Sequence, residues 1–164
     1  MKNGIVIADA GPIFSLAVLQ KLELLDALFN EIKIPSAVWE EITLNENTPT
    51  YKPIFNYFKN KVFKINGLND LNLIMDYGES EAVTLYREVN ADFLLLDDKK
   101  ARKIAENFGL KCIGTIGLLV AAKSKQLIPE LAPEFKKLIV NKRYYSVDLL
   151  NELLLQNNES PLTM

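Results

Sequence analysis

Acidic residues stand directly after two short apolar runs, and carboxylates in such positions can do hydrolytic chemistry with a bound cation. Asp9 follows the run 5–8, and Asp97 and Asp98 follow the run 93–96. Both runs are typical of buried strands. In parallel sheets, ligand sites lie beyond the carboxyl ends of the strands. We therefore expect these three side chains at one edge of a sheet.

Two further pairs of acidic residues lie near expected helix starts. Glu40 and Glu41 follow a Pro-Ser turn, and Glu79 and Glu81 follow Gly78. A single acidic residue at a strand end can equally be a helix cap or a turn residue. Carboxylates that are brought together repel one another, and their pKa values rise unless a cation compensates. Four placements of this kind therefore favour a metal site, and carboxylate oxygens prefer hard cations such as Mg²⁺ or Mn²⁺.

Composition excludes most other hydrolytic machinery. The 164 residues include no histidine, which rules out Ser-His-Asp and Cys-His mechanisms and histidine-based zinc sites. The single cysteine, Cys112, rules out intrachain disulfides and suits a reducing compartment. The net charge of −2 provides no general attraction for nucleic acid. A phosphate-binding surface must therefore be local or made with metal ions.

The chain has neither a recognisable signal peptide nor an apolar run long enough for a membrane span, which needs roughly 18 residues. We therefore expect a cytoplasmic protein without a membrane segment.

Strands and helices of about ten residues alternate along the chain. This alternation is typical of a parallel sheet that is covered on both faces. We expect a three-layer α/β/α fold with a mainly parallel central sheet, forming a single domain over 1–164 with its core at about 4–128. Three residues predict helix starts: Pro12 as a first helical residue, and Ser36 and Thr115 as N-caps.

A helical tail is expected at 129–164. Its apolar stripe either packs on the domain or forms a surface for a partner or a homodimer, and it consists of Val147, Leu149, Leu150, Leu153 and Leu154.

Five short motifs carry a resemblance to a known family. They are Asp9-Ala-Gly-Pro-Ile13, Ile34-Pro-Ser-Ala-Val-Trp-Glu-Glu-Ile42, Gly78-Glu-Ser-Glu-Ala82, Leu94-Leu-Leu-Asp-Asp98 and Gly114-Thr-Ile-Gly-Leu118. In this order and spacing they resemble a PIN-domain branch of small prokaryotic proteins, similar to the toxin nucleases of VapBC-type toxin–antitoxin pairs. The resemblance covers about residues 4–128, and the leucine-rich tail is also similar to that group.

The resemblance implies four catalytic, metal-binding carboxylates: Asp9, Glu41, Glu79 and Asp97. Asp98 either shares the metal or caps the helix expected at 99–108. Glu81 is the alternative to Glu79, and Glu40 is expected to face solvent. Candidate substrate contacts are Thr115, Lys99 and Lys100. Thr115 can alternatively be a helix cap, and the two lysines can lie on a solvated helix face.

The resemblance also implies a function. It predicts metal-assisted hydrolysis of single-stranded RNA, with Mg²⁺ or Mn²⁺ as cofactor. It further predicts the toxin of a type II toxin–antitoxin pair, bound by a small antitoxin protein. The alternative is an inactive PIN-like module that binds a regulatory partner. All four acidic positions are filled, which argues against that alternative.

Overall fold

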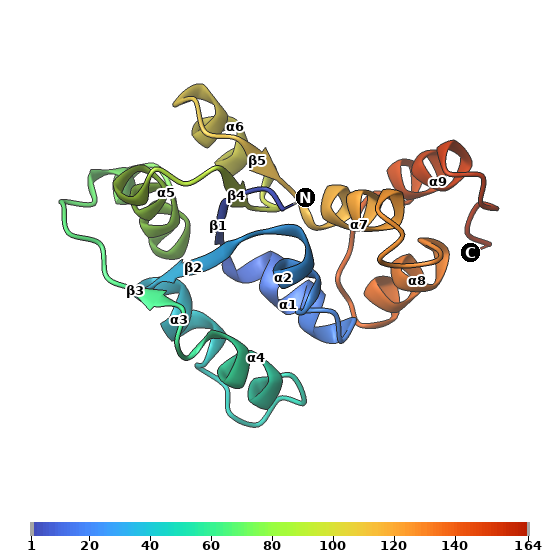
Figure 1. The fold of residues 1–164 in the computed structure, drawn as a ribbon, viewed down its shortest axis with the longest axis horizontal. Coiled ribbons are helices and arrows are strands. Elements are labelled where there is room, and N and C mark those ends of the chain that lie inside the picture. Colours follow the sequence, from blue (N-terminus) through green and yellow to red (C-terminus); the bar gives the residue numbers. More distant parts are fainter. Residues whose placement is uncertain (1, 164) are drawn as a thin grey trace.

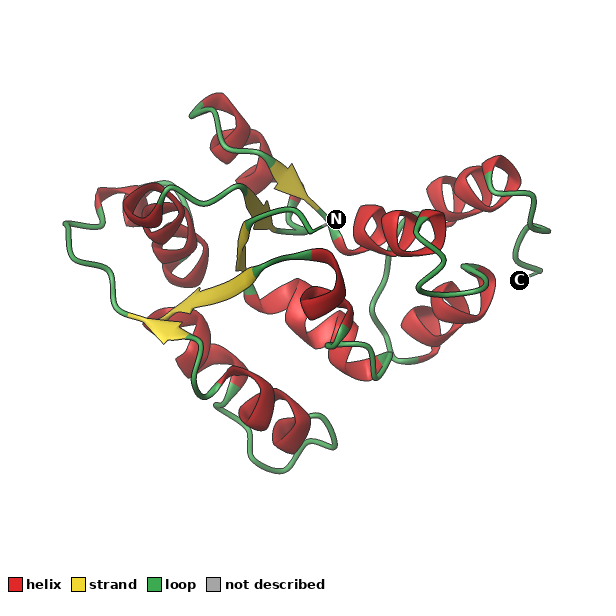
Figure 2. Cartoon of the chain, viewed as in Figure 1, coloured by secondary structure: helices red, strands yellow, loops and turns green. Residues whose placement is uncertain are grey.

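A five-stranded sheet forms the centre of the computed structural model, which describes residues 2–163 (Figures 1 and 2). Every neighbouring pair of strands runs parallel, in the order β3-β2-β1-β4-β5. The strands are β1 Ile5–Ala8, β2 Glu31–Pro35, β3 Val62–Phe63, β4 Phe93–Leu95 and β5 Cys112–Ile113. The predicted fold class is confirmed, and the sheet is entirely parallel.

Helices cover both faces of this sheet. They are α1 Ala10–Val18, α2 Leu24–Leu28, α3 Ser36–Ile42, α4 Tyr51–Phe58, α5 Tyr77–Val89, α6 Lys99–Asn107, α7 Thr115–Ser124, α8 Ala132–Val140 and α9 Val147–Gln156, with a short 3₁₀ helix, η1, at Asp70–Leu73. The larger core cluster contains side chains of α1–α4 and α7–α9, whereas the smaller one contains those of α5, α6 and η1. Within residues 2–163, no helix is both long and apolar enough to cross a membrane.

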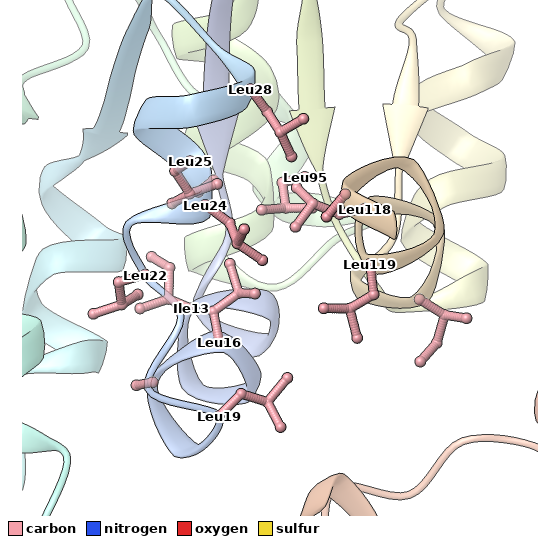
Figure 3. Close-up of a cluster of buried hydrophobic side chains, with 14 of the residues drawn as sticks. Ile13, Leu16, Leu19, Leu22, Leu24, Leu25, Leu28, Leu95, Leu118 and Leu119 are labelled. Carbon is pink, nitrogen blue, oxygen red and sulfur yellow. The ribbon is translucent and has the colours of Figure 1, made fainter. Parts of the chain in front are cut away.

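The central strands bury both of their faces. Val6 and Ala8 of β1 belong to the larger cluster, whereas Ile7 between them belongs to the smaller one. In β4, Leu95 belongs to the larger cluster and Leu94 to the smaller one. Successive side chains of a strand point to opposite faces, so a run of apolar residues is what a doubly covered strand requires. Figure 3 shows Leu95 among the leucines of α1, α2 and α7 in the larger cluster.

The direction in which the chain crosses the sheet changes between β1 and β4. The chain proceeds from β1 to β2 and β3 on one side, and then returns to place β4 and β5 on the other side. Ala8 is paired with Leu95, and the backbone N–H of Asp9 donates to the Leu95 carbonyl at 2.9 Å. Asp9 and Asp97 therefore leave the sheet at neighbouring points. Such a change of direction is where open α/β sheets bind ligands.

Three helices begin at residues other than those predicted. Pro12 is the third residue of α1 rather than the first, because the helix starts at Ala10. Ser36 and Thr115 are each the first residue of their helices rather than N-caps, since the N-cap positions are held by the residues before them. In each case the N-cap residue is extended, and no side chain at that position makes a capping hydrogen bond.

The C-terminal tail packs on the rest of the chain. Phe135 of α8 and Leu150 and Leu154 of α9 are fully buried in the larger core cluster. Figure 1 shows α7, α8 and α9 together at one end of the molecule. Val147 and Leu149 remain partly exposed. The predicted stripe thus faces inward on one side and is accessible on the other.

Candidate functional site

Asp9 is a buried carboxylate at the junction of β1 and α1. It holds the N-cap position of α1 without capping the helix through its side chain, and it is only 9% exposed. The pKa of Asp9 is raised to about 7, mainly by burial, against a smaller opposing effect of the Ala10 backbone N–H. The charges of Glu41, Asp76 and Asp97 contribute to this rise. Near neutral pH, this carboxylate therefore needs a proton or a cation.

Gly78 brings the first turn of α5 against two of the predicted ligands. A Cβ atom at residue 78 would lie 3.1 Å from Glu41 Oε1 and 3.7 Å from Asp9 Oδ1. Both oxygens therefore border the same small volume above the α5 backbone. A side chain at residue 78 would fill that volume, so glycine keeps it open.

Asp76 and Glu79 form a capping box at the start of α5. The backbone N–H of Glu79 donates to Asp76 Oδ1 at 2.8 Å, and that of Asp76 donates to Glu79 Oε1 at 3.4 Å. Glu79 is buried, and its pKa is raised to about 8, with burial as the largest cause. A side-chain hydrogen bond with Asp76 and the charges of Asp76, Asp9 and Asp98 are the other causes of this rise. Glu79 and Asp9 thus belong to one electrostatically coupled group.

The neighbouring glutamates face other surroundings. Glu81 Oε1 accepts a hydrogen bond from the Ala37 backbone N–H at 3.0 Å, which ties α5 to the first turn of α3. Glu40 is exposed on α3. Glu41 is also exposed overall, but partial burial of its carboxylate and the charge of Asp76 raise its pKa. Glu41 and Glu79 are therefore the glutamates that interact with the Asp9 region, whereas Glu81 fastens the two helices.

Asp97 is held by three hydrogen bonds. Its Oδ1 accepts from the Thr115 backbone N–H at 2.7 Å, and its Oδ2 accepts from the Thr115 hydroxyl at 2.7 Å and the Tyr145 hydroxyl at 2.8 Å. Thr115 is fully buried. The residue predicted as a substrate contact or a cap therefore uses its hydroxyl to orient Asp97.

Tyr145 connects Asp97 to α1 from the segment between α8 and α9. Its hydroxyl oxygen lies 2.8 Å from Ser15 Oγ. Arg143 Nε donates to the same Ser15 oxygen at 3.1 Å, and Arg143 Nη2 donates to the Gly11 carbonyl at 2.9 Å. Burial, followed by the charge of Asp97, raises the pKa of Tyr145 to about 12, so its hydroxyl stays protonated at neutral pH.

The remaining predicted residues lie around α6. Asp98 is the N-cap of α6, and its Oδ1 accepts from the Ala101 backbone N–H at 2.8 Å, which is one of its two predicted roles. Lys99 borders a large cleft next to Asp97. Lys100 borders a smaller hollow that Asp76, Glu79 and Asp98 also line.

The chemistry of these side chains suits a divalent cation. Within residues 2–163, no three acidic side chains stand close enough to enclose an ion without moving. Asp9 and Glu41 nevertheless border the open volume at Gly78, and repulsion and burial raise the pKa values of Asp9, Glu41 and Glu79. Carboxylate oxygens are the ligands that Mg²⁺ prefers. The carboxylates of Asp9, Glu41 and Glu79 therefore fit such an ion, and side-chain rotations would bring them together around it.

The comparison with protein families identifies the family of this chain. A family model, DUF3368, described as a PIN domain, matches residues 5–159. This chain belongs to the PIN-domain family. None of the curated proteins compared with the chain matches it. The predicted family is confirmed, and this PIN domain has a nuclease-type fold.

Two parts of the site in this PIN domain were not predicted from the sequence: Asp76, and the connection through Tyr145 and Arg143. Asp76 was overlooked, although its position three residues before Glu79 is the local pattern of a capping box. The connection of Tyr145 and Arg143 to the site had no local signal. Tyr145 reaches Asp97 across 48 residues of sequence.

Proposed function

We propose that this PIN domain is a metal-dependent endoribonuclease that cleaves single-stranded RNA. One observation carries the proposal: Asp9 is buried beside Glu41 at the edge where β1 and β4 end, and no basic side chain among residues 2–163 forms an ion pair with it. Grouping like charges in this way opposes folding, and functional sites are where such conflicts are expected. A cation offsets the repulsion, and the family supplies the nuclease context.

Asp9, Glu41, Glu79 and Asp97 would hold Mg²⁺ or Mn²⁺, with Asp98 at the border of the shell. When bound, the cation supplies an activated water and positive charge for the phosphate. Asp9 and Glu79 give up their protons on binding, because a ligand carboxylate must be ionised.

Thr115 and Tyr145 are positioning residues that contact Asp97 rather than the ion. They donate to both oxygens of Asp97 and so hold its carboxylate in one orientation. Tyr145 is in turn fixed through Ser15 and Arg143. In this proposal, the C-terminal segment is part of the catalytic arrangement.

Single-stranded RNA fits the position of the site. The carboxylates lie at the end of the sheet, where an unstacked strand can reach them, and the basic side chains Lys99 and Arg102 border the adjacent cleft. A net charge of −2 provides no broad basic face for a duplex. The free Cys112 suits action in the cytoplasm.

Incubation with labelled RNA tests this function. Wild-type protein with Mn²⁺ or Mg²⁺ should cut single-stranded RNA at internal positions, and should cut double-stranded RNA and single-stranded DNA much more slowly. EDTA should stop cleavage, and added Mn²⁺ should restore it. Equal cleavage with and without EDTA would contradict a metal mechanism.

We further propose that the protein is the toxin of a type II toxin–antitoxin pair, neutralised by a small antitoxin protein. The partly exposed apolar residues Val147 and Leu149 support a protein partner. Expression without a partner should slow bacterial growth, and Asp9→Asn should relieve the effect. Normal growth with an expressed, active nuclease would contradict the toxin role and leave the ribonuclease activity standing.

The second candidate function is an inactive module that binds a regulatory protein. It is favoured by the internal hydrogen bonds of Asp97 and the capping role of Asp98, which occupy both carboxylates without a metal. Calorimetric titration with Mn²⁺ separates the two candidates. Heat of binding that is lost in Asp9→Asn supports the nuclease, whereas no binding by folded wild type supports the module.

A further inference from the structure

A cleft of about 800 Å³ opens beside Asp97. Its walls come from the start of α6, from the turn between β5 and α7, and from the segment 144–153 that leads into α9. We call it the Tyr144 cleft. Its volume lies in the range of small-molecule sites, and Asp97 at its border makes it continuous with the candidate metal site.

The interior of the Tyr144 cleft is largely apolar. Ile113, Ile116, Leu149 and Leu153 line it, and the Tyr144 side chain is 74% exposed. Tyr144 contacts no other aromatic ring within residues 2–163. An apolar slot with an accessible aromatic ring suits a flat, partly apolar group such as a nucleobase.

Basic side chains border the same cleft. Lys99 and Arg102 line it, and with Lys103 they also line a neighbouring hollow of about 400 Å³ on α6. Within the part of the chain that the structure describes, none of these three side chains has an acidic partner within 4.0 Å. They are therefore available for anions. The Arg102 guanidinium lies near Asp97, since a Cβ atom at Gly114 would be 3.1 Å from Arg102 Nη1 and 3.0 Å from Asp97 Oδ1.

We propose that the Tyr144 cleft binds one nucleotide of the RNA, next to the phosphate that is cut. The base lies in the apolar slot against Tyr144, and the adjoining phosphate lies at Lys99 and Arg102. The strand then continues along α6 past Lys103. This inference rests on the proposed ribonuclease function and assigns its first substrate subsite.

An RNA strand fits the cleft better than a protein segment does. Three basic residues, Lys99, Arg102 and Lys103, line the hollow on α6 beyond the cleft together with one acidic residue, Glu106, so a phosphate backbone meets a net positive surface there. The acidic end of the cleft, at Asp97 and Asp98, meets the site where the cation is proposed. A single chain of phosphates can thus contact the basic residues and the metal site together.

Binding of a short RNA tests the subsite separately from cleavage. Asp9→Asn protein, which should not cut RNA, is titrated in EDTA into a fluorescein-labelled, single-stranded eight-nucleotide RNA, and the dissociation constant is measured by anisotropy. Adding Tyr144→Ala should weaken binding at least about fivefold, because stacking contributes that much per base. Tyr144→Phe keeps the ring and should bind like the parent. Phe63→Ala, an exposed aromatic residue on the edge strand β3, is the matched control and should change nothing.

Two further measurements separate stacking from general damage. An RNA with abasic positions should bind Tyr144→Ala and its parent equally, because the lost contact is to a base. Arg102→Ala should reduce the slope of log affinity against log salt by about 0.7, the value for one phosphate of a single strand.

The outcomes are distinguishable. If wild-type protein cuts RNA while Tyr144→Ala changes neither binding nor kcat/KM, the subsite is wrong and the ribonuclease function stands. If Tyr144→Ala instead abolishes only neutralisation by a partner protein, the cleft is a protein-binding surface and the subsite is overturned. If wild type neither binds nor cuts RNA, the subsite and the proposed function both fail.

Discussion

Replacing Asp9 by asparagine should stabilise the metal-free protein above neutral pH. The pKa of Asp9 is about 7, against an ordinary value of 3.8. A tenfold change in proton affinity corresponds to about 1.4 kcal/mol, so the buried charge costs the folded state about 4 kcal/mol once the pH exceeds 7. The folded state binds this proton more tightly than the unfolded state, so wild-type stability should fall as pH rises from about 4 to 7.

Asparagine keeps the shape of Asp9 and removes the charge. The gain from Asp9→Asn should therefore approach about 4 kcal/mol at pH 8 and shrink to about 2 kcal/mol at pH 5, where most wild-type molecules carry the proton in the folded state. Part of this gain is relief of the repulsion that Glu41 and Asp76 exert at this position.

Urea unfolding followed by circular dichroism measures both values. Wild type, Asp9→Asn and the control Glu46→Gln are compared in EDTA at pH 5 and pH 8. Glu46 is exposed in a polar loop, so its replacement should change stability at neither pH. A loss of stability in Asp9→Asn at pH 8, or an equal gain at both pH values, would refute the electrostatic account and make Asp9 a structural residue of α1.

Three other predictions follow from the same geometry. Asp97→Asn should destabilise the metal-free protein by about 1–3 kcal/mol in the same urea assay, because Asp97 accepts three hydrogen bonds; a gain would show that repulsion dominates there too. Gly78→Ala should weaken Mn²⁺ binding at least about tenfold in calorimetry, because its Cβ would lie 3.1 Å from Glu41 Oε1; unchanged affinity would place the ion elsewhere. Mn²⁺ should bind at least about tenfold more tightly at pH 8 than at pH 6, because protons on Asp9 and Glu79, with pKa values of about 7 and 8, compete with it; pH-independent affinity would exclude these ligands.

The placement of Asp9 and Asp97 at one edge of the sheet could be predicted from the sequence, because it depends only on which apolar runs form strands. Two apolar runs that end in acidic residues become neighbours in any parallel sheet that pairs them, and β1 and β4 do pair, with Ala8 opposite Leu95. Glu41 and Glu79 came from the family resemblance. No pattern of polarity indicates that Gly78 would leave room between Glu41 and Asp9.

Other parts of the site depend on contacts that the sequence does not encode locally. Tyr145 reaches Asp97 from an irregular segment, and tertiary packing of the tail decides that contact. The starts of α1, α3 and α7 were misplaced for a related reason. Proline and hydroxyl residues mark helix starts when capping decides them, but here each strand turns directly into the following helix.

Single-turnover cleavage by wild type and Asp9→Asn tests the central claim most directly. Both proteins, purified identically and loaded with Mn²⁺, are mixed in excess with one 5′-labelled single-stranded RNA. The account predicts that Asp9→Asn is folded and cuts roughly 100-fold more slowly or worse, because a ligand of the ion should matter at least as much as the residues that orient one. Equal cleavage rates for the two folded proteins would contradict it, since the activity would then not depend on the carboxylate at the end of β1.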